Sequence, residues 1–244
     1  MKKITKNQSL MLSIVLMLSL TMQSSCSYAF KGVKGDGNVV KQQRDVSSFS
    51  GIEVGGAFHV FLAQGTTEKL EVEADENLLG IIKTEVKGGT LHITTTKDIR
   101  DSEALNIYLT FKEIHEMEVS GACKLTGEDK FTFTDLEMDC SGASSIDLKL
   151  SANKLEMDCS GASNIELYGS AQKVEMDVSG ASHFDAYELE VENYEIEVSG
   201  AAGAKIFVTG ELSAKVSGAA HLKYKGDARI THHDVSGAGS MKKY

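Results

Sequence analysis

The chain has 244 residues, a formal net charge of −10, and neither proline nor tryptophan. This acidic balance argues against nucleic acid as a partner, because a surface that binds nucleic acid must neutralise phosphates with Lys and Arg. The absence of proline favours strands inside a sheet, where every backbone N–H is needed for pairing.

Residues 1–25 have the layout of a secretory signal peptide. Lys2, Lys3 and Lys6 precede an apolar run over residues 10–22, which is shorter than a comfortable membrane span. We therefore predict that the chain is exported and has no internal transmembrane helix.

Two cleavage sites remain open. Cleavage before Cys26 would make this residue the lipid-bearing end of a bacterial lipoprotein, although Gln23 stands where a lipobox usually has leucine. Cleavage after Ala29 would follow a small-x-small sequence and leave no lipid. Residues 26–38 contain three glycines and are predicted to be a flexible tether. The expected location is the outer membrane, the periplasm or the cell surface, with Cys26 as the membrane anchor in the lipoprotein case.

Residues 39–111 are predicted to be a β-rich but irregular N-terminal portion that covers the edge of the first repeat. Such an edge, left open, would template aggregation. Asp75 is a candidate cap for a short helix over residues 77–82. Residues 53–58 read like a degenerate copy of residues 118–123. The candidate strands are residues 51–54, 58–63, 70–74, 84–86, 90–96 and 104–111.

Residues 112–244 are dominated by one repeat. The tripeptide Ser-Gly-Ala recurs at intervals of 18 to 21 residues, and a period near 19 indicates a solenoid. Before each copy, apolar and acidic residues alternate, as in a strand with one buried and one solvated face. A second apolar pair follows each copy, so Ser-Gly-Ala is predicted to form a corner between two strands. The copies begin at Ser120, Ser141, Ser160, Ser179, Ser199, Ser217 and Ser236.

The fold class predicted from this repeat is all-β, a parallel β-solenoid with rungs of about 19 residues. Residues 49–60 and 70–78, followed by the Ser-Gly-Ala repeats, make the chain resemble the DUF2807 family, whose label is an autotransporter adhesin head or GIN domain. The resemblance covers about residues 39–225 and implies an exported bacterial β-solenoid without catalytic residues; the adhesin role in that label is inferred at the level of the family. The repeats continue to Ser236, so we expect the last rung to be exposed or capped only by residues 241–244.

Two acidic columns are the main candidate site. If the rungs stack in register, equivalent carboxylates lie ~4.8 Å apart along the solenoid axis. Three interpretations remain open: a solvated face that keeps an exported rod soluble, a row of weak sites for a divalent cation such as Ca²⁺, or a face for a basic partner. The candidates are Glu137, Glu156 and Glu175 in one column and Asp139, Asp158 and Asp177 in the other.

We expect no enzymatic activity and no cofactor other than Ca²⁺ in the cation case. A β-helix enzyme acting on polysaccharide is the alternative, because carboxylates ~5 Å apart suit a retaining glycosidase. However, the carboxylates repeat down the whole face without one pair standing apart, and only three arginines are present. The predicted function is therefore an adhesin or structural scaffold that binds an unknown protein or glycan surface.

The cysteines and histidines are predicted to be structural. Cys140 and Cys159 occupy one inward column, where neighbouring strands lie within disulfide range, but valine fills that column elsewhere and favours two buried thiols. Cys123 has a different register and is expected to be unpaired. By alternation, His233 points inward and His232 outward near the last rung.

Charge is unevenly distributed along the repeats. Residues 101–200 hold 22 acidic and 6 basic side chains, whereas residues 201–244 hold 3 acidic and 7 basic ones. An end-to-end contact between the acidic body of one copy and the basic terminus of another is a hypothesis that follows from this polarity.

Overall fold

The structure is a computed structural model that describes residues 32–244, and these residues form one compact unit. The predicted signal peptide, both cleavage sites and Cys26 lie outside the described residues. Within residues 32–244 no helix is long and apolar enough to cross a bilayer.

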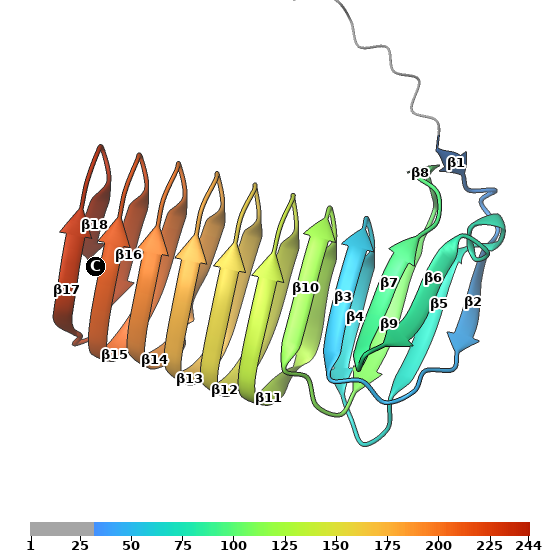
Figure 1. Ribbon diagram of the computed structural model, residues 1–244, viewed down its shortest axis with the longest axis horizontal. Helices are drawn as coiled ribbons and strands as arrows, with labels where there is room; N and C mark the ends of the chain where they lie inside the picture. Colours follow the sequence, from blue (N-terminus) through green and yellow to red (C-terminus); the bar gives the residue numbers. More distant parts are fainter. Residues whose placement is uncertain (1–31) are drawn as a thin grey trace, which may run out of the picture. The chain divides into compact units, whose positions relative to one another are not determined.

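The repeats fold as a parallel β-solenoid with two faces (Figure 1). Each long strand contributes to both faces: the first part of β11 pairs with β4, whereas its second part pairs with β10. We call face 1 the strand segments that precede each Ser-Gly-Ala corner and face 2 the segments that follow it. The long strands are β11 (Lys124–Cys140), β12 (Ser145–Cys159), β13 (Asn164–Val178), β14 (His183–Val198) and β15 (Gly203–Val216).

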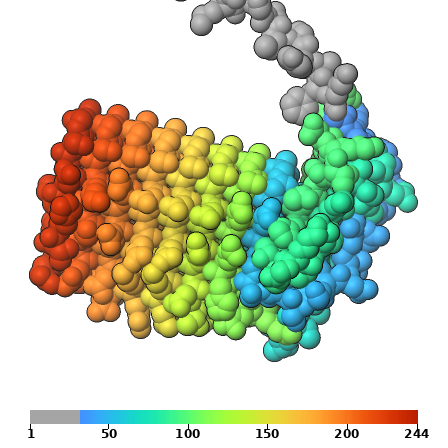
Figure 2. Space-filling view, in the orientation of Figure 1, coloured from blue at the N-terminus to red at the C-terminus, as the bar shows by residue number. Residues whose placement is uncertain are grey.

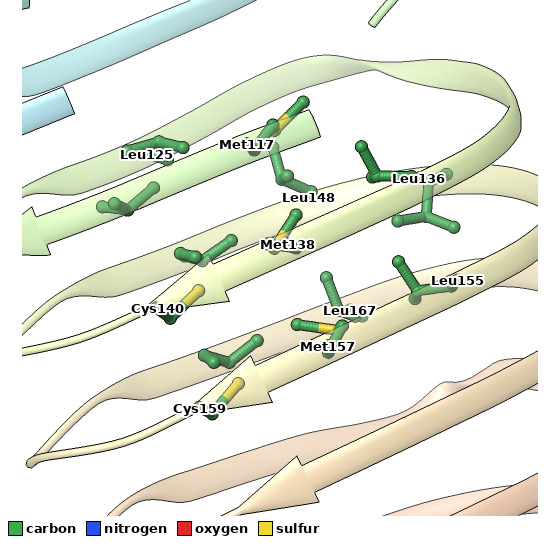
Figure 3. Close-up of a cluster of buried hydrophobic side chains, with 14 of the residues drawn as sticks. Met117, Leu125, Leu136, Met138, Cys140, Leu148, Leu155, Met157, Cys159 and Leu167 are labelled. Carbon is green, nitrogen blue, oxygen red and sulfur yellow. The ribbon is translucent and has the colours of Figure 1, made fainter. Parts of the chain in front are cut away.

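Inward side chains stack in columns between the two faces. Leu136 pairs with Leu155, and Met138 pairs with Met157, so each column repeats one kind of side chain from rung to rung. Figure 3 shows the face-1 methionines and the face-2 leucines, Leu148 among them, pointing into the same space. All are buried, and each such side chain contributes about 1.5–3 kcal/mol by burial. The predicted solenoid and its rung period are confirmed.

Cys140 and Cys159 face each other across adjacent rungs as free, buried thiols, and Cys123 is also free and buried. Contact with Cys159, together with burial, raises the pKa of the Cys140 thiol well above its usual range. The thiol therefore stays protonated and fills the column as a small apolar group.

The corners stack as regularly as the strands. Gly142 and Gly161 have φ angles of +81° and +86°, and the backbone N–H of Ala162 donates to the Gly142 carbonyl at 2.8 Å. A buried serine closes each of the three best-formed corners: the hydroxyl of Ser163, for example, donates to the Ser160 carbonyl at 3.2 Å. The Ser-Gly-Ala-Ser sequence is thus explained by one left-handed glycine and one buried hydroxyl.

The N-terminal portion extends both faces out of chain order. β3 and β4 form a rung, since Gly55 and Gly56 pair with Ser120 and Gly121, which confirms the degenerate copy of the repeat. This rung lies between β10 and β7, and Figure 2 shows it as a blue band with green surfaces on both sides. The strands are β1 (Val33–Lys34), β2 (Val39–Arg44), β3 (Gly51–Gly56), β4 (His59–Gln64), β5 (Lys69–Asp75), β6 (Ile82–Lys87), β7 (Thr90–Thr95), β8 (Ile99–Asp101), β9 (Leu105–Phe111) and β10 (Glu116–Gly121).

All six strands predicted here are present, but the predicted helix and tether differ from the structure. Only a 3-10 turn, η1 (Glu76–Leu78), forms, and Asp75 does not cap it. The buried Asp75 carboxylate instead accepts backbone N–H groups from Gly37 at 2.6 Å and Glu103 at 2.9 Å. Residues 32–38 are therefore fixed to the body, because Asp75 accepts the Gly37 N–H and β1 pairs with β8.

The two ends of the solenoid differ. At the N-terminal end, Arg44 reaches from β2 on face 2 to the carbonyls of Ile82 and Leu79 beside face 1 and closes the interior. At the C-terminal end, β17 (Arg229–Val235) and β18 (Ser240–Lys243) follow β16 (His221–Lys225), and every residue of β17 is exposed.

The exposed last rung expected from the sequence is confirmed. His233 does pair with Ala214 of the inward column. It is exposed, because no further rung covers that column at this end of the chain.

Candidate functional site

Face 1 carries the two predicted acidic columns in strict register. The outward side chains of β10 to β14 pair rung by rung, so each carboxylate inside a column has a carboxylate above and below it. We call them the Glu column and the Asp column. The Glu column is Glu116, Glu137, Glu156, Glu175 and Glu195, and the Asp column is Glu118, Asp139, Asp158, Asp177 and Glu197.

The Glu column is partly neutralised by lysines of its own face. Lys154 forms ion pairs with Glu156 and with Glu175, the latter at 3.3 Å, and Lys173 also pairs with Glu175. The hydrogen bond from Lys173 lowers the pKa of Glu175, with Lys154 adding to the effect. This column is therefore a mixed surface of bridged charges.

The Asp column has counter-charges only at its two ends. Glu53 continues the column beyond Glu118 and pairs with His92 at 2.6 Å, while Glu197 pairs with Lys215 at 3.7 Å. Within residues 32–244 the middle members have no ion-pair partner; they are Glu118, Asp139, Asp158 and Asp177.

The unpaired carboxylates perturb one another. Burial by neighbouring side chains, followed by the charge of Asp158, raises the pKa of both Asp139 and Asp177 above its usual range. Burial and a neighbouring like charge both disfavour the ionised form of a carboxyl group.

A shallow hollow of about 430 Å³ lies over the same columns. It covers β12 to β15 and ends at Lys215. The carboxylates that line it are Glu156, Asp158, Glu175, Asp177, Glu195 and Glu197.

The structure brings the six predicted candidates into two rows but not into a metal-binding cluster. Across the described residues 32–244, no three His, Cys, Asp or Glu side chains are grouped so as to hold an ion. The geometry is instead that of a linear array of negative charge at ~4.8 Å intervals, which suits several cationic groups of a partner at once. The seventh candidate residue found from sequence, Cys26, lies outside the described part.

The basic residues at the borders of the columns were not identified from the sequence. Lys154 and Lys173 stand two positions before their glutamates, so the spacing did contain a signal for the bridged Glu column. His92 comes from outside the repeat period, and only the pairing of β3 with β7 brings it to the column.

Solved structures of several bacterial proteins share this fold. A crystal structure of a putative adhesin from Bacteroides fragilis is 22% identical with a TM-score of 0.83, covering 87% of this chain and 100% of that chain. A putative lipid binding protein from Parabacteroides distasonis is 23% identical with a TM-score of 0.72, covering 87% and 99%. A putative adhesin from Parabacteroides merdae is 19% identical with a TM-score of 0.68, covering 87% and 98%.

At these identities the likeness shows a shared fold. A comparison with curated proteins finds no match. The family model described as "Putative auto-transporter adhesin, head GIN domain", DUF2807, matches residues 48–228, which is most of the described solenoid. The chain belongs to the DUF2807 family.

Proposed function

We propose that this chain is an exported, non-catalytic adhesin-type scaffold whose Asp column binds a partner with a row of basic groups. The observation that carries the proposal is the unpaired run of carboxylates between Glu118 and Asp177 on a flat, exposed sheet face. The family and fold comparisons support adhesion as the class of function.

The repulsion between carboxylates of the Asp column lowers the stability of the fold, which supports a role for the column beyond solubility. Like charges directly opposite one another in a sheet are destabilising, and scattered charges would solubilise the rod equally well. Lysines bridge Glu156 and Glu175 in the middle of the Glu column, whereas the equivalent middle of the Asp column has no such bridge within residues 32–244. A basic partner would relieve the repulsion, so part of the binding free energy comes from the strain of the free face.

Binding by such a column is multivalent. Each carboxylate offers a weak, solvated contact, and the rigid spacing turns the later contacts into intramolecular events once the first has formed. We expect the affinity to fall steeply with salt, because every contact is an exposed ion pair.

The test is retention of the chain on envelope fractions, matrix proteins and glycans with matched charge variants. The triple variant D139N/D158N/D177N should lose binding, whereas a control triple of exposed turn acids, E128Q/D129N/E192Q, changes the net charge equally and should keep it. Equal loss in both triples would show a general charge effect, and full binding by the first triple would move the site elsewhere. Release of soluble sugar from a glycan during the assay would overturn the non-catalytic part.

A cation-dependent scaffold is the second candidate from the sequence, but no observation favours it. Neighbouring carboxylates of a column point the same way from parallel strands, so they do not converge on one point as Ca²⁺ ligands do. A rise in thermal midpoint with millimolar Ca²⁺, absent with NaCl of equal ionic strength, would reverse this choice.

We also propose that the membrane contact, if the lipoprotein site is used, is through Cys26 alone. The mass of the mature N-terminus separates the two processing routes. An acylated N-terminal Cys26 identifies a lipoprotein, whereas a chain beginning at Phe30 identifies a protein without a lipid anchor.

A further inference from the structure

Face 2 carries a second charged column with an unusual order. Its outward side chains at one position per rung read acid, acid, acid, base, base, base along the solenoid axis. Every neighbouring pair in this column is in register. We call it the mixed column, and its members are Asp147, Glu166, Asp185, Lys205, Lys223 and Lys242.

Charge bridging within the chain involves only the centre of the column. Lys205 pairs with Asp185 at 2.6 Å, where the acidic half meets the basic half. Asp147, Lys223 and Lys242 are exposed and have no ion pair within the described residues. The two ends of the column therefore carry uncompensated charge of opposite sign.

The order of charges makes the column complementary to its own reversed copy. A two-fold axis parallel to the strands, passing between the Asp185 and Lys205 rungs, turns the acidic half of one copy onto the basic half of the other. Because both columns have the same β-rung interval of ~4.8 Å, the match holds at every rung. The reciprocal contacts are Asp147 with Lys242 of the second copy, Glu166 with Lys223 of the second copy, and Asp185 with Lys205 of the second copy.

We propose that face 2 is the interface of a symmetric dimer of this chain, held by the mixed column. This is the isologous arrangement in which residue i meets j and j meets i. The dimer goes beyond the proposed function, since it uses the opposite face and leaves both Asp columns exposed for a partner.

The neighbouring columns fit the same rotation. On one side the outward residues of face 2 are small or polar, such as Asn164, His183 and Gly203. On the other side the rotation sets Tyr168 opposite Lys225 of the second copy. That lysine already lies over the Phe207 ring at 4.8 Å, so it has the position of a cation–π partner. The rotation brings no like charges together in these three columns.

The size of the contact predicts a weak dimer. The mixed column spans about 24 Å at ~4.8 Å per rung, and each face-2 segment is about 17 Å long at ~3.3 Å per residue. The two copies would bury on the order of 800–1,000 Å² in total, which is below the usual size of a stable interface. Exposed ion pairs dominate it, so we expect salt to dissociate the dimer.

Sedimentation of the purified chain without its export signal tests the proposal. We expect concentration-dependent dimers at about 50 mM salt and monomers at about 500 mM. E166K and K223E should each weaken association at least about tenfold, because each sets like charges opposite one another. The double variant E166K/K223E should restore the dimer, since the two exchanged charges again face each other.

These variants are expected to fold, because each places a charge between two opposite charges of its own column. A zero-length carboxylate–amine cross-linker gives an independent readout. Within one copy Glu166 and Lys223 are three rungs, about 14 Å, apart, so a Glu166–Lys223 cross-link reports the second copy. D158K on face 1 is the control and should leave the dimer intact. A monomer at all concentrations at low salt, single reversals without effect, or no rescue by the double variant would overturn the proposal.

Discussion

Gly161 shows how a single backbone angle sets the shape of every rung. Its φ is +86°, and a Cβ at this position would meet the Gly142 carbonyl oxygen at 2.3 Å. The residue is therefore needed both for its left-handed conformation and for the close stacking of one corner on the next.

Substitution separates these two requirements. Gly161→Ala should lower the free energy of unfolding by more than about 2 kcal/mol, since it adds a backbone clash to left-handed strain. Gly37→Ala, which has φ +80° but open space around it, should cost only the strain, about 1 kcal/mol. Gly80→Ala, with open space and no left-handed φ, is the control. Chemical denaturation measures all three, and equal costs for Gly161 and Gly37 would contradict the stacking argument.

Asp75 fixes the N-terminal segment from the interior of the protein. Burial would by itself raise the pKa of Asp75, but the backbone N–H groups of Gly37, Glu103 and Ala104 hold it below its usual range. A lowered pKa means that the carboxylate stabilises the fold above the ordinary carboxyl pKa, and that this contribution is lost as the pH falls through the folded pKa.

Asp75→Asn should therefore destabilise the chain by about 2–3 kcal/mol at neutral pH. The NH₂ group of the asparagine is a donor, and it would face backbone N–H groups that are donors too. The difference from the parent should shrink as the pH falls below about 4. Asp101→Asn, which breaks only the exposed ion pair with Lys34, should cost less than about 0.5 kcal/mol. Thermal unfolding over pH measures both variants, and a pH-independent difference for Asp75→Asn would contradict the role of its charge.

At the scale of the element, the Asp column should cost stability in the free protein. The pKa of Asp139 and Asp177 is raised, so the folded chain holds these protons more tightly than the unfolded chain. Their contribution to stability therefore falls as the pH rises from the ordinary carboxyl pKa through the raised one, which is the opposite sign to Asp75.

The variant D139N/D158N/D177N should raise the free energy of unfolding by about 0.5–2 kcal/mol at pH 7, because it removes the four like-charge pairs that these residues form with one another and with Glu118 and Glu197. The gain should decrease with added salt and disappear below about pH 4. Urea unfolding is the measurement, with E128Q/D129N/E192Q as the equal-charge control. A loss of stability in the first triple would show that the column is compensated after all.

The strands of the repeat could be predicted from the sequence because each depends on local alternation and on a period that recurs seven times. The acidic columns followed at once, since register in a parallel stack is set by the same period. The ranges of β5 and β6 were predicted, but their places in the fold did not follow in the same way, because nothing periodic marks them. β5 pairs antiparallel with the distant β9, β6 pairs antiparallel with its neighbour β7, and η1 replaces the predicted helix.

The contacts that could not be predicted from the sequence were missed for the same reason. Asp75 looked like a helix cap from its neighbours, but its partners Gly37 and Glu103 come from distant segments. His92 reaches the Asp column only because β7 pairs with β3. The inward position of His233 was predicted correctly in register, whereas its exposure reflects that no rung within residues 32–244 covers β17.

At the scale of the whole molecule, the two ends should contribute unequally to stability. In a solenoid each rung is stabilised mainly by its neighbours. Removing residues 229–244 takes away the exposed β17 and the half-buried β18, and should leave a cooperatively folded protein with a slightly lower thermal midpoint. Removing residues 32–48 takes away β2 and the Arg44 bridge and should lower the midpoint more, although a similar number of residues is lost. Equal decreases in the thermal midpoint of the two truncated proteins, measured by calorimetry, would contradict a closed N-terminal end.

In this account the two charged faces of the molecule have different roles. Face 1 presents unpaired carboxylates to a partner, and the mixed column of face 2 joins two copies with those carboxylates directed outward. The assignment of face 1 is the central claim, because the proposed function depends on it. The proposed dimer depends only on face 2.

The most direct test of that claim follows the side-chain carboxyl resonances of the chain by NMR during titration with a short oligolysine. The account predicts that Asp139, Asp158 and Asp177 shift first and saturate together, at concentrations where Asp129 and Asp147 have hardly moved. Uniform shifts of all exposed carboxylates, or early shifts confined to another face, would contradict the Asp column as the binding face.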